Sequence, residues 1–206
     1  MTRKVEALQH FKRIDPHFYK ATKAQHASLP EQLPAKRTRQ ELFASLVSIV
    51  ISQQLGIAAA DTIFARVKKA CGIRLSPKAV LKTRLSKFRK AGLSGAKTKT
   101  LKAIAAAVTD NSLDLLSLKK IPEAAAAKKL IQIWGLGPWS VEMFMMHSLG
   151  RDDIFSPGDL GLIRAMETIY DLPKNAPRTS LLVIAGKWSP YRTYASLLLW
   201  RTRSNQ

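Results

Sequence analysis

The chain contains a single cysteine, Cys71, and this scarcity limits the chemistry open to it. One cysteine excludes an intrachain disulfide and a four-cysteine iron–sulfur site, and it is consistent with a reducing compartment. The four histidines show no paired spacing of the kind that zinc sites use. We therefore expect a reduced protein with no zinc site.

Long apolar runs are also missing. No stretch reaches the length of a membrane span, and the first residues, MTRKVEALQHFKRID, lack the apolar core of a secretory signal. We expect an intracellular, soluble protein with no membrane partner, in the cytoplasm or nucleoid of a bacterium or the nucleus of a eukaryote. Val- and Ile-rich runs with a period of two are absent too, as are hairpin turn pairs.

Helical patterns fill the space that strands do not, so the fold class is predicted to be all-α. The segment RQELFASLVSIVISQQL, residues 39–55, is apolar on most faces and is typical of a buried central helix. Alanines, N-terminal prolines and capping residues mark the others. Helices are expected near residues 5–12, 39–55, 57–71, 77–83, 86–93, 95–110, 121–133, from 138 onward, and at 159–170, 177–188 and 191–203.

Acidic residues are few: 14 Asp and Glu stand against 34 Lys and Arg, a formal net charge of +20. Because 46% of the residues are hydrophobic, this is a folded cationic protein and not a disordered basic tail. Twelve Lys and Arg lie between Lys68 and Lys102, with no Asp or Glu among them. A one-sign stretch of this length favours contact with a polyanion backbone, and a solvated face that aids solubility is the alternative.

Residues 130–163 combine a glycine turn with a later aspartate. Gly135 and Gly137 permit a tight turn with close backbone approach, and Pro138 suits the first turn of the helix that follows. The exposed amides of a helix start can bind a phosphate without reading bases. Asp159 lies 22 residues after Gly137, directly before LGLIRAMETIY. An ordinary connection between two helices is the alternative for the glycines, and the charge and Asp159 argue against it.

The stretch IWGLGPWSVEMFMMHSL, followed by DIFSPGDLGL, resembles the helix-hairpin-helix DNA glycosylases that carry a Gly/Pro-rich loop and an aspartate. More narrowly it is similar to the 3-methyladenine DNA glycosylase II group. SIVISQQLGIAAADTI and GLSGAKTKTLKAIA fit the same resemblance, which covers about residues 42–200. It implies one glycosylase unit over residues 1–206, with two helical lobes flanking a DNA-binding cleft. One lobe would span about 42–147, with the hairpin at 134–138, and the other would combine 1–41 with 148–206.

The resemblance implies that Asp159 is the catalytic carboxylate, and a helix N-cap is the alternative that its position also allows. Bifunctional relatives carry a nucleophilic lysine two positions after the second hairpin glycine, where this chain has Trp139. Without that lysine no Schiff base forms at this site, and no lyase activity is expected. Trp139 would bind a cationic alkylbase through its ring, with Tyr191 as a second aromatic of the base pocket. Trp134, Trp188 and Trp200 are expected to be core residues.

The same resemblance implies the contacts with DNA. Leu55, after Gln54, would fill the gap that an extruded nucleotide leaves. Gly135 and Gly137 would hold a phosphate, and Lys97, in the G-L-S-x-x-K helix start, would also contact DNA. No cofactor is required, although the backbone carbonyls of the hairpin could hold a structural Na⁺ or K⁺; these belong to Ile131, Ile133 and Leu136.

We therefore expect a monomeric, monofunctional DNA glycosylase of base excision repair. It would bind double-stranded DNA, flip an alkylated purine of the 3-methyladenine or 7-methylguanine class, and hydrolyse its bond to the sugar. A glycosylase for deaminated or oxidised bases is one alternative, and a non-enzymatic helix-hairpin-helix DNA-binding module is another.

Overall fold

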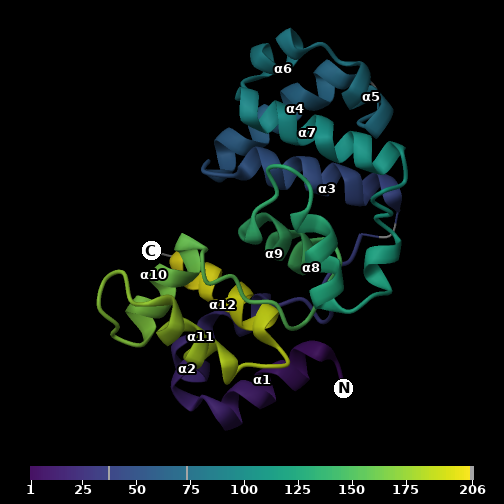
Figure 1. Cartoon of the computed structure of the whole chain (residues 1–206). Coiled ribbons are helices and arrows are strands. Elements are labelled where there is room, and N and C mark those ends of the chain that lie inside the picture. Colours follow the sequence, from purple (N-terminus) through teal and green to yellow (C-terminus); the bar gives the residue numbers. More distant parts are fainter. Residues whose placement is uncertain (37, 73, 205–206) are drawn as a thin grey trace. The chain divides into compact units, whose positions relative to one another are not determined.

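The computed structural model describes residues 1–36, 38–72 and 74–204, and the regular structure in these ranges is entirely helical, which confirms the predicted all-α class (Figure 1). No helix in the described ranges is long and apolar enough to cross a membrane. The helices, in chain order, are α1 (Arg3–Ile14), α2 (Pro16–Ala21), η1 (Lys23–Ser28), α3 (Arg39–Ser52), α4 (Ile57–Cys71), α5 (Pro77–Lys82), α6 (Leu85–Ala91), α7 (Gly95–Thr109), η2 (Ser117–Lys119), α8 (Glu123–Ile131), α9 (Pro138–His147), α10 (Leu160–Ile169), α11 (Arg178–Gly186) and α12 (Arg192–Ser204).

The chain forms two compact units. Unit 1 consists of Met1–Pro34 and Met145–Gln206, and unit 2 of Ala35–Phe144. Unit 2 begins before the expected residue 42, because the first turn of α3 is already bound within it. The Arg39 guanidinium donates to the carbonyl of Val108 and to Oδ1 of Asn111, both in unit 2. The second boundary falls within α9, a few residues before the expected position.

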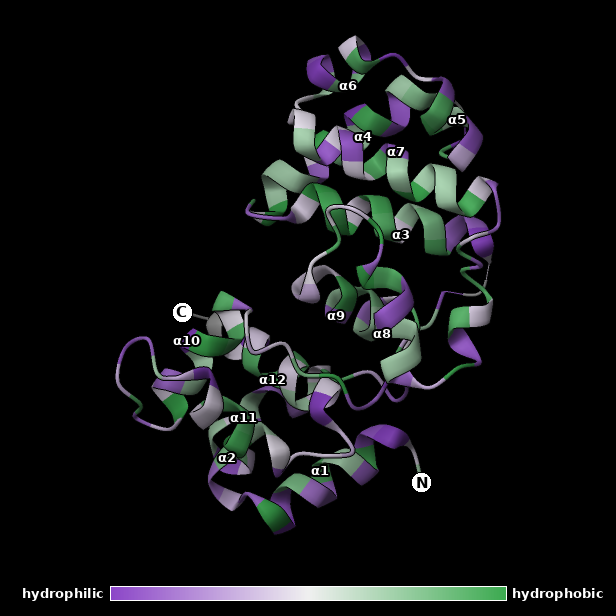
Figure 2. Cartoon of the chain, viewed as in Figure 1, coloured by the Kyte–Doolittle hydropathy of each residue, from purple (hydrophilic) through white to green (hydrophobic). Residues whose placement is uncertain are grey.

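Helix α3 is the central element of unit 2. It starts with a capping box, in which Thr38 Oγ1 accepts from the Glu41 amide at 3.1 Å and Glu41 Oε2 accepts from the Thr38 amide at 2.9 Å. Most of its residues are apolar (Figure 2). Six of these side chains are buried, which confirms the expected central helix, although it ends at Ser52 and not at residue 55. The buried residues are Leu42, Phe43, Leu46, Val47, Val50 and Ile51.

Helix α7 lies against α3, α5 and α6 and supports several segments of unit 2. Ser94 caps its start by accepting from the Lys97 amide at 3.2 Å. Near its middle, Lys102 Nζ donates to the carbonyls of Leu81 at 2.6 Å and Thr83 at 2.8 Å, which fixes the end of α5. A lysine on one helix thereby satisfies carbonyls that the end of another helix leaves unpaired.

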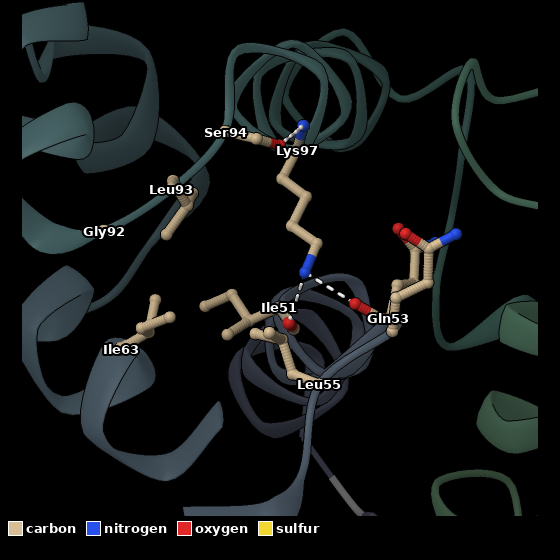
Figure 3. A pocket seen from close by; sticks show the side chains of 9 residues that line it. Ile51, Gln53, Leu55, Ile63, Gly92, Leu93, Ser94 and Lys97 are labelled. Atoms are coloured by element: carbon tan, nitrogen blue, oxygen red, sulfur yellow. Dashed lines mark hydrogen bonds between the residues drawn. The ribbon is translucent and has the colours of Figure 1, made fainter. Parts of the chain in front are cut away.

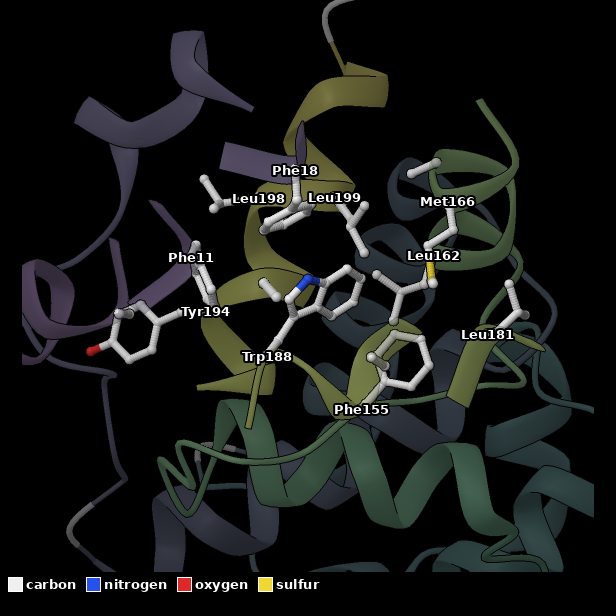
Figure 4. Packing of buried hydrophobic residues seen from close by; sticks show 14 of the residues in the cluster. Phe11, Phe18, Phe155, Leu162, Met166, Leu181, Trp188, Tyr194, Leu198 and Leu199 are labelled. Carbon is white, nitrogen blue, oxygen red and sulfur yellow. The ribbon is translucent and has the colours of Figure 1, made fainter. Parts of the chain in front are cut away.

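The core of unit 1 is built around Trp188, which is fully buried as expected (Figure 4). Its ring lies 4.6 Å from that of Phe18 and 6.0 Å from that of Phe155, centroid to centroid. The indole N–H donates to Oδ2 of Asp15 at 3.3 Å, and Asp15 Oδ1 caps α2 by accepting from the Phe18 amide. One buried carboxylate therefore joins the start of α2 to the aromatic core.

Candidate functional site

The turn between α8 and α9 requires its first glycine. Gly135 has a φ of +85°, a conformation that side chains with a Cβ rarely adopt. A Cβ at this position would also overlap the hydroxyl of Thr100, on α7. The turn is closed by a hydrogen bond from the Leu136 amide to the Ile133 carbonyl at 3.0 Å. Gly135 is thus explained by packing and backbone geometry.

Gly137 lies in a different environment from Gly135. A Cβ at this residue would meet nothing within 4 Å, so the fold itself does not demand a glycine here. Its carbonyl accepts from the Val141 amide at 3.1 Å and so begins α9, and Pro138 follows at the first helical position. The missing side chain leaves open space beside a helix start, where amides of the first turn can bind an anion. The geometry suits a phosphate at this turn.

Two aromatic residues flank this turn. Trp139, at the second position of α9, is half-buried. Trp134 is 47% exposed, so the expectation that it is a core residue is wrong. Lys99 Nζ lies 4.2 Å from the centre of the Trp134 ring, a cation–π contact that holds the indole at the surface.

The loop that follows α3 carries the predicted wedge. Gln54 has a φ of +58°, which is disfavoured for a residue with a side chain. The chain turns sharply there, with the Leu55 amide donating to the Ser52 carbonyl at 3.1 Å. The Leu55 side chain is 40% exposed, beside a pocket of about 240 Å³ (Figure 3). An exposed leucine on a tight loop is compatible with insertion into a base stack.

Lys97 and Gln53 hold this loop from two sides. Lys97 Nζ donates to the carbonyls of Ile51 at 2.8 Å and Gln53 at 2.7 Å, as the dashed lines in Figure 3 mark. The Gln53 amide nitrogen donates to the Gly135 carbonyl at 3.1 Å and to Ser140 Oγ at 2.8 Å. Burial lowers the pKa of Lys97. Its ammonium is therefore engaged within the chain, and the expected contact of Lys97 with DNA stays a prediction.

The predicted polyanion surface keeps ten of its twelve cations at the surface, because Lys97 and Lys102 are the two directed at backbone carbonyls. The ten lie on or beside α4, α5, α6 and α7, and all are exposed. They are Lys68, Lys69, Arg74, Lys78, Lys82, Arg84, Lys87, Arg89, Lys90 and Lys99.

Asp159 is the N-cap of α10, as its position before the helix allowed. Its Oδ1 accepts from the Leu162 amide at 3.0 Å and from Trp200 Nε1 at 2.9 Å. Gly161 leaves room for this arrangement, since a Cβ there would come within 3.0 Å of both Asp159 Oδ1 and Trp200 Cδ1. Two N–H donors on one oxygen fix the orientation of the carboxylate at the start of α10.

Trp200 packs against the core of unit 1, as expected, and its contact with Asp159 also makes it a functional candidate. Its indole donates to Asp159, and the ring of His147 lies 5.5 Å away at an angle of 33°. Trp200 lies 41 positions after Asp159, on α12, and no local pattern marks the pair.

The two other acidic residues of the Asp159 loop are used in ion pairs. Arg192 donates to both oxygens of Asp153, at 2.7 Å and 3.0 Å, and Ser189 adds a third hydrogen bond at 2.8 Å. Asp152 lies 3.4 Å from Arg3 Nε. Both carboxylates bind groups of α1 or of the start of α12, which leaves Asp159 as the catalytic candidate of this loop.

Tyr191 lies against α1. Its hydroxyl donates to Glu6 Oε2 at 3.2 Å, and its ring packs edge-on against His10 with the centroids 5.6 Å apart. These contacts engage both ends of the side chain in packing within unit 1. The role of Tyr191 in a base pocket stays a prediction.

Among the residues that the structure describes, no three His, Cys, Asp or Glu side chains come together as metal ligands. The structural cation implied at the hairpin would instead bind the carbonyls of Ile131, Ile133 and Leu136. The Ile133 carbonyl already accepts from the Leu136 amide, which leaves it one lone pair for a cation. The carbonyl set thus has room for a cation at Ile133, and the ion itself stays a prediction.

The chain is similar in sequence and fold to known proteins. The chain is 32% identical over 170 residues to DNA-3-methyladenine glycosylase 1 of Schizosaccharomyces pombe, covering 80% of this chain and 73% of that protein. A crystal structure of DNA-3-methyladenine glycosidase from Bacillus halodurans matches with a TM-score of 0.78 and 32% identity, over 98% of this chain and 89% of the other. The Schizosaccharomyces pombe 3-methyladenine DNA glycosylase in complex with abasic DNA matches with a TM-score of 0.79 and 26% identity, over 97% of each chain.

A family model covers the segment that contains the loop after α3, with Gln53 and Leu55, the hairpin and Asp159. It spans residues 47–189 and describes a base excision DNA repair protein. The match extends over more than half of the chain, and the solved structures agree with it along nearly the whole length. The chain belongs to the HhH-GPD superfamily of base excision DNA repair proteins.

Proposed function

We propose that the protein is a monofunctional DNA-3-methyladenine glycosylase. It hydrolyses the N-glycosidic bond between deoxyribose and an alkylated purine in double-stranded DNA and leaves an abasic site. The observation that carries this proposal is Asp159, a carboxylate at the start of α10 whose Oδ1 accepts from Leu162 and Trp200. The relatives named above, which share the fold and 26–32% of the sequence, support the alkylpurine class.

Asp159 supplies the chemistry that such a reaction needs. An alkylpurine with a positive charge is already a good leaving group, so little general-acid assistance is required. The barrier lies in the oxocarbenium-like sugar that forms as the bond lengthens. A fixed negative charge stabilises that cation, and the same carboxylate orients the attacking water and accepts its proton. A single orientation of the carboxylate avoids reorganisation during the reaction.

Trp139 stands at the position where a lysine nucleophile would be expected in a bifunctional glycosylase. Formation of a Schiff base with the sugar needs an amine, and the position holds an indole. Water is then the nucleophile, and the products are free base and an intact strand with an abasic site. The ring of Trp139 offers an electron-rich face to a cationic base, worth about 0.5–2 kcal/mol. Tyr191 is the second aromatic proposed for this pocket.

DNA is held mainly through its phosphates. The open space at Gly137 and the first turn of α9 form one grip, and the ten exposed cations add charge that does not depend on sequence. Leu55, with Gln54 beside it, fills the gap left by the extruded nucleotide. A Na⁺ or K⁺ on the hairpin carbonyls would stiffen the turn, and the protein acts as a monomer.

One substitution separates catalysis from structure at Asp159. Asn is as good an N-cap as Asp, so Asp159→Asn keeps the bond to Leu162 and loses the charge. We expect no measurable release of 7-methylguanine or 3-methyladenine from duplex DNA by Asp159→Asn, with binding to a tetrahydrofuran abasic duplex within about threefold of wild type, since binding rests on phosphate contacts. Release at near the wild-type rate would reduce Asp159 to a cap.

The same assay covers the competing functions. Duplexes that contain hypoxanthine, uracil or 8-oxoguanine are incubated in parallel, and base release is followed. Release of only these bases would make the protein a glycosylase for deaminated or oxidised lesions. Binding without release of any base would make it a DNA-binding module. Strand scission without alkali or heat would contradict the monofunctional assignment.

A further inference from the structure

The Leu55 loop and the hairpin turn are joined by a side chain that neither motif explains. The amide nitrogen of Gln53 donates one hydrogen bond to the Gly135 carbonyl and one to Ser140 Oγ, at 3.1 Å and 2.8 Å. Ser140 lies in the first turn of α9 and is 2% exposed. Gln53 thus uses both amide protons to reach the two sides of the turn at Gly137, from 82 to 87 positions away in sequence.

Helix α7 contacts both segments. Lys97 Nζ binds the carbonyls of Ile51 and Gln53, at the end of α3. One turn further along the same helix, Thr100 lies against the backbone of Gly135 so closely that no side chain fits there. Ser94 fixes the start of α7 and hence the position of Lys97. The loop and the turn therefore rest on one helix and are tied to each other by Gln53.

The loop needs such restraint. Gln54 has a φ of +58° without being glycine, and a backbone in this region persists only where its surroundings impose it. The residue before it, Gln53, is held at two points. Lys97 donates to its carbonyl, and its side-chain amide donates to the Gly135 carbonyl and to Ser140 Oγ. The residue after Gln54, Leu55, is 40% exposed, and its amide donates to the Ser52 carbonyl at 3.1 Å. The restraints from Lys97, Gly135 and Ser140 therefore act on Gln53, two residues before the exposed Leu55 side chain.

We propose that Gln53 and Lys97 are positioning residues that hold the Leu55 loop and the Gly135–Gly137 turn in one arrangement, so that phosphate binding at the turn aims Leu55 at the lesion. The inference rests on the proposed function, because it gives Leu55 the role of wedge. Neither residue touches the reacting atoms. Phosphate binding and insertion of Leu55 into the base stack are thereby coupled. The position of the bound phosphate then determines where along the strand the bases unstack.

The test uses the full chain and a duplex with a tetrahydrofuran abasic site, flanked by 2-aminopurine, whose fluorescence rises when the base unstacks. Gln53→Met has nearly the same length and lacks both donors. We expect the equilibrium constant for unstacking, measured from 2-aminopurine fluorescence at saturating protein, to fall roughly tenfold. This is the size expected from two lost hydrogen bonds. Binding to undamaged duplex should change by less than about twofold, because the phosphate contacts remain.

A double-mutant cycle asks whether Gln53 acts through Leu55. In the Leu55→Ala background the wedge is absent, so Gln53→Met should cause no further loss of unstacking. Equal losses from Gln53→Met in both backgrounds would overturn the proposal, since the glutamine would then act on something other than the leucine. Gln40→Met, the same substitution at the exposed first turn of α3, is the matched control and should leave the signal unchanged.

Lysine variants provide a second comparison that does not depend on Gln53. Lys97 and Lys102 lie on the same helix, and each ammonium binds two carbonyls at the end of another helix. Lys97→Met and Lys102→Met should therefore lower the Tm by similar amounts, while only Lys97→Met weakens unstacking. Equal unstacking by both variants would overturn the role of Lys97. This pair decides the matter if Gln53→Met does not fold.

Failure of this inference and failure of the proposed function are distinguishable. Base release by the wild type tests the function, and unstacking at an abasic site requires no chemistry. A wild type that releases alkylpurines while Gln53→Met and Lys97→Met unstack normally would leave the function intact and overturn the positioning roles. A wild type that releases no base would overturn the function alone.

Discussion

The indole N–H of Trp200 donates to Oδ1 of Asp159 at 2.9 Å and so joins α12 to the start of α10. The carboxylate oxygen that it holds is the one that caps the helix. The ring of His147 packs against the indole, with the ring centroids 5.5 Å apart. The side chain that orients the Asp159 carboxylate, the proposed catalytic group, is therefore itself held by packing.

Trp200→Phe should slow base release with little effect on DNA binding. Phenylalanine keeps an aromatic ring against His147 and removes the donor to Asp159, so the carboxylate gains freedom to turn. Loss of one charge-assisted hydrogen bond predicts a fall in kcat of roughly tenfold. Single-turnover release of 7-methylguanine measures it. A weaker affinity for abasic DNA with unchanged kcat would instead place Trp200 in DNA binding.

Removing the cap and removing the charge of Asp159 should have different effects on stability. Asp159→Ala loses the acceptor for the Leu162 amide and should lower the free energy of unfolding by about 1 kcal/mol, whereas Asp159→Asn should be near wild type. Urea unfolding of the two variants measures the difference. Equal stability of Ala and Asn would show that the cap bond contributes nothing.

The two hairpin glycines should respond oppositely to alanine. Gly135→Ala forces a Cβ into a left-handed backbone and into Thr100, so we expect a loss of stability of about 1 kcal/mol or more. Gly137→Ala meets no atom within 4 Å and should leave the Tm unchanged, while the methyl group keeps a phosphate away from the turn. Thermal unfolding and anisotropy with an abasic duplex separate the two effects. Unaltered DNA binding by Gly137→Ala would remove the phosphate from this turn.

Trp139→Leu should impair release of cationic bases more than release of neutral ones. The cation–π contribution of about 0.5–2 kcal/mol corresponds to about a 2–30-fold loss for 7-methylguanine. Hypoxanthine, which carries no charge, should be affected less if it is released at all. Parallel single-turnover assays on the two duplexes give the ratio. Equal losses would assign Trp139 to shape and not to charge.

The sequence allowed the helices to be predicted because their signals are local. The capping box of Thr38 and Glu41, and the serine and proline at the start of α5, lie within a few residues of the termini they define. The hairpin could be located for the same reason, since Gly135 answers a backbone requirement of its own turn.

Long-range side-chain contacts could not be predicted in this way. Trp134, Trp188 and Trp200 are the same residue type, yet only Trp188 is fully buried. Trp134 is exposed beside Lys99, and the Trp200 indole donates to Asp159. What distinguishes them is a partner tens of positions away. Gln53 could not be singled out from the sequence, because nothing in S-Q-Q-L indicates a hydrogen bond to Gly135.

The ion pair of Asp153 and Arg192 predicts how stability depends on pH. Burial alone would raise the pKa of Asp153, but the hydrogen bonds from Arg192 and Ser189 outweigh it and hold the pKa below its usual value. A folded-state pKa below the unfolded one means that the carboxylate stabilises the fold above the unfolded pKa, near 3.9, and loses this effect as the pH falls through the folded value.

Asp153→Asn should therefore be less stable than wild type at pH 7, by on the order of 1 kcal/mol, because the pair is partly exposed and solvent screens it. The difference should shrink as the pH falls below about 4, where the unfolded carboxylate takes up its proton, and should vanish once the pH is below the lower folded-state pKa, where the two side chains are alike in charge. Urea unfolding at pH 7, 5, 4 and 3 measures it. A difference that stays constant from pH 7 to pH 3 would mean that the side-chain shape, and not its charge, holds Arg192 at the start of α12.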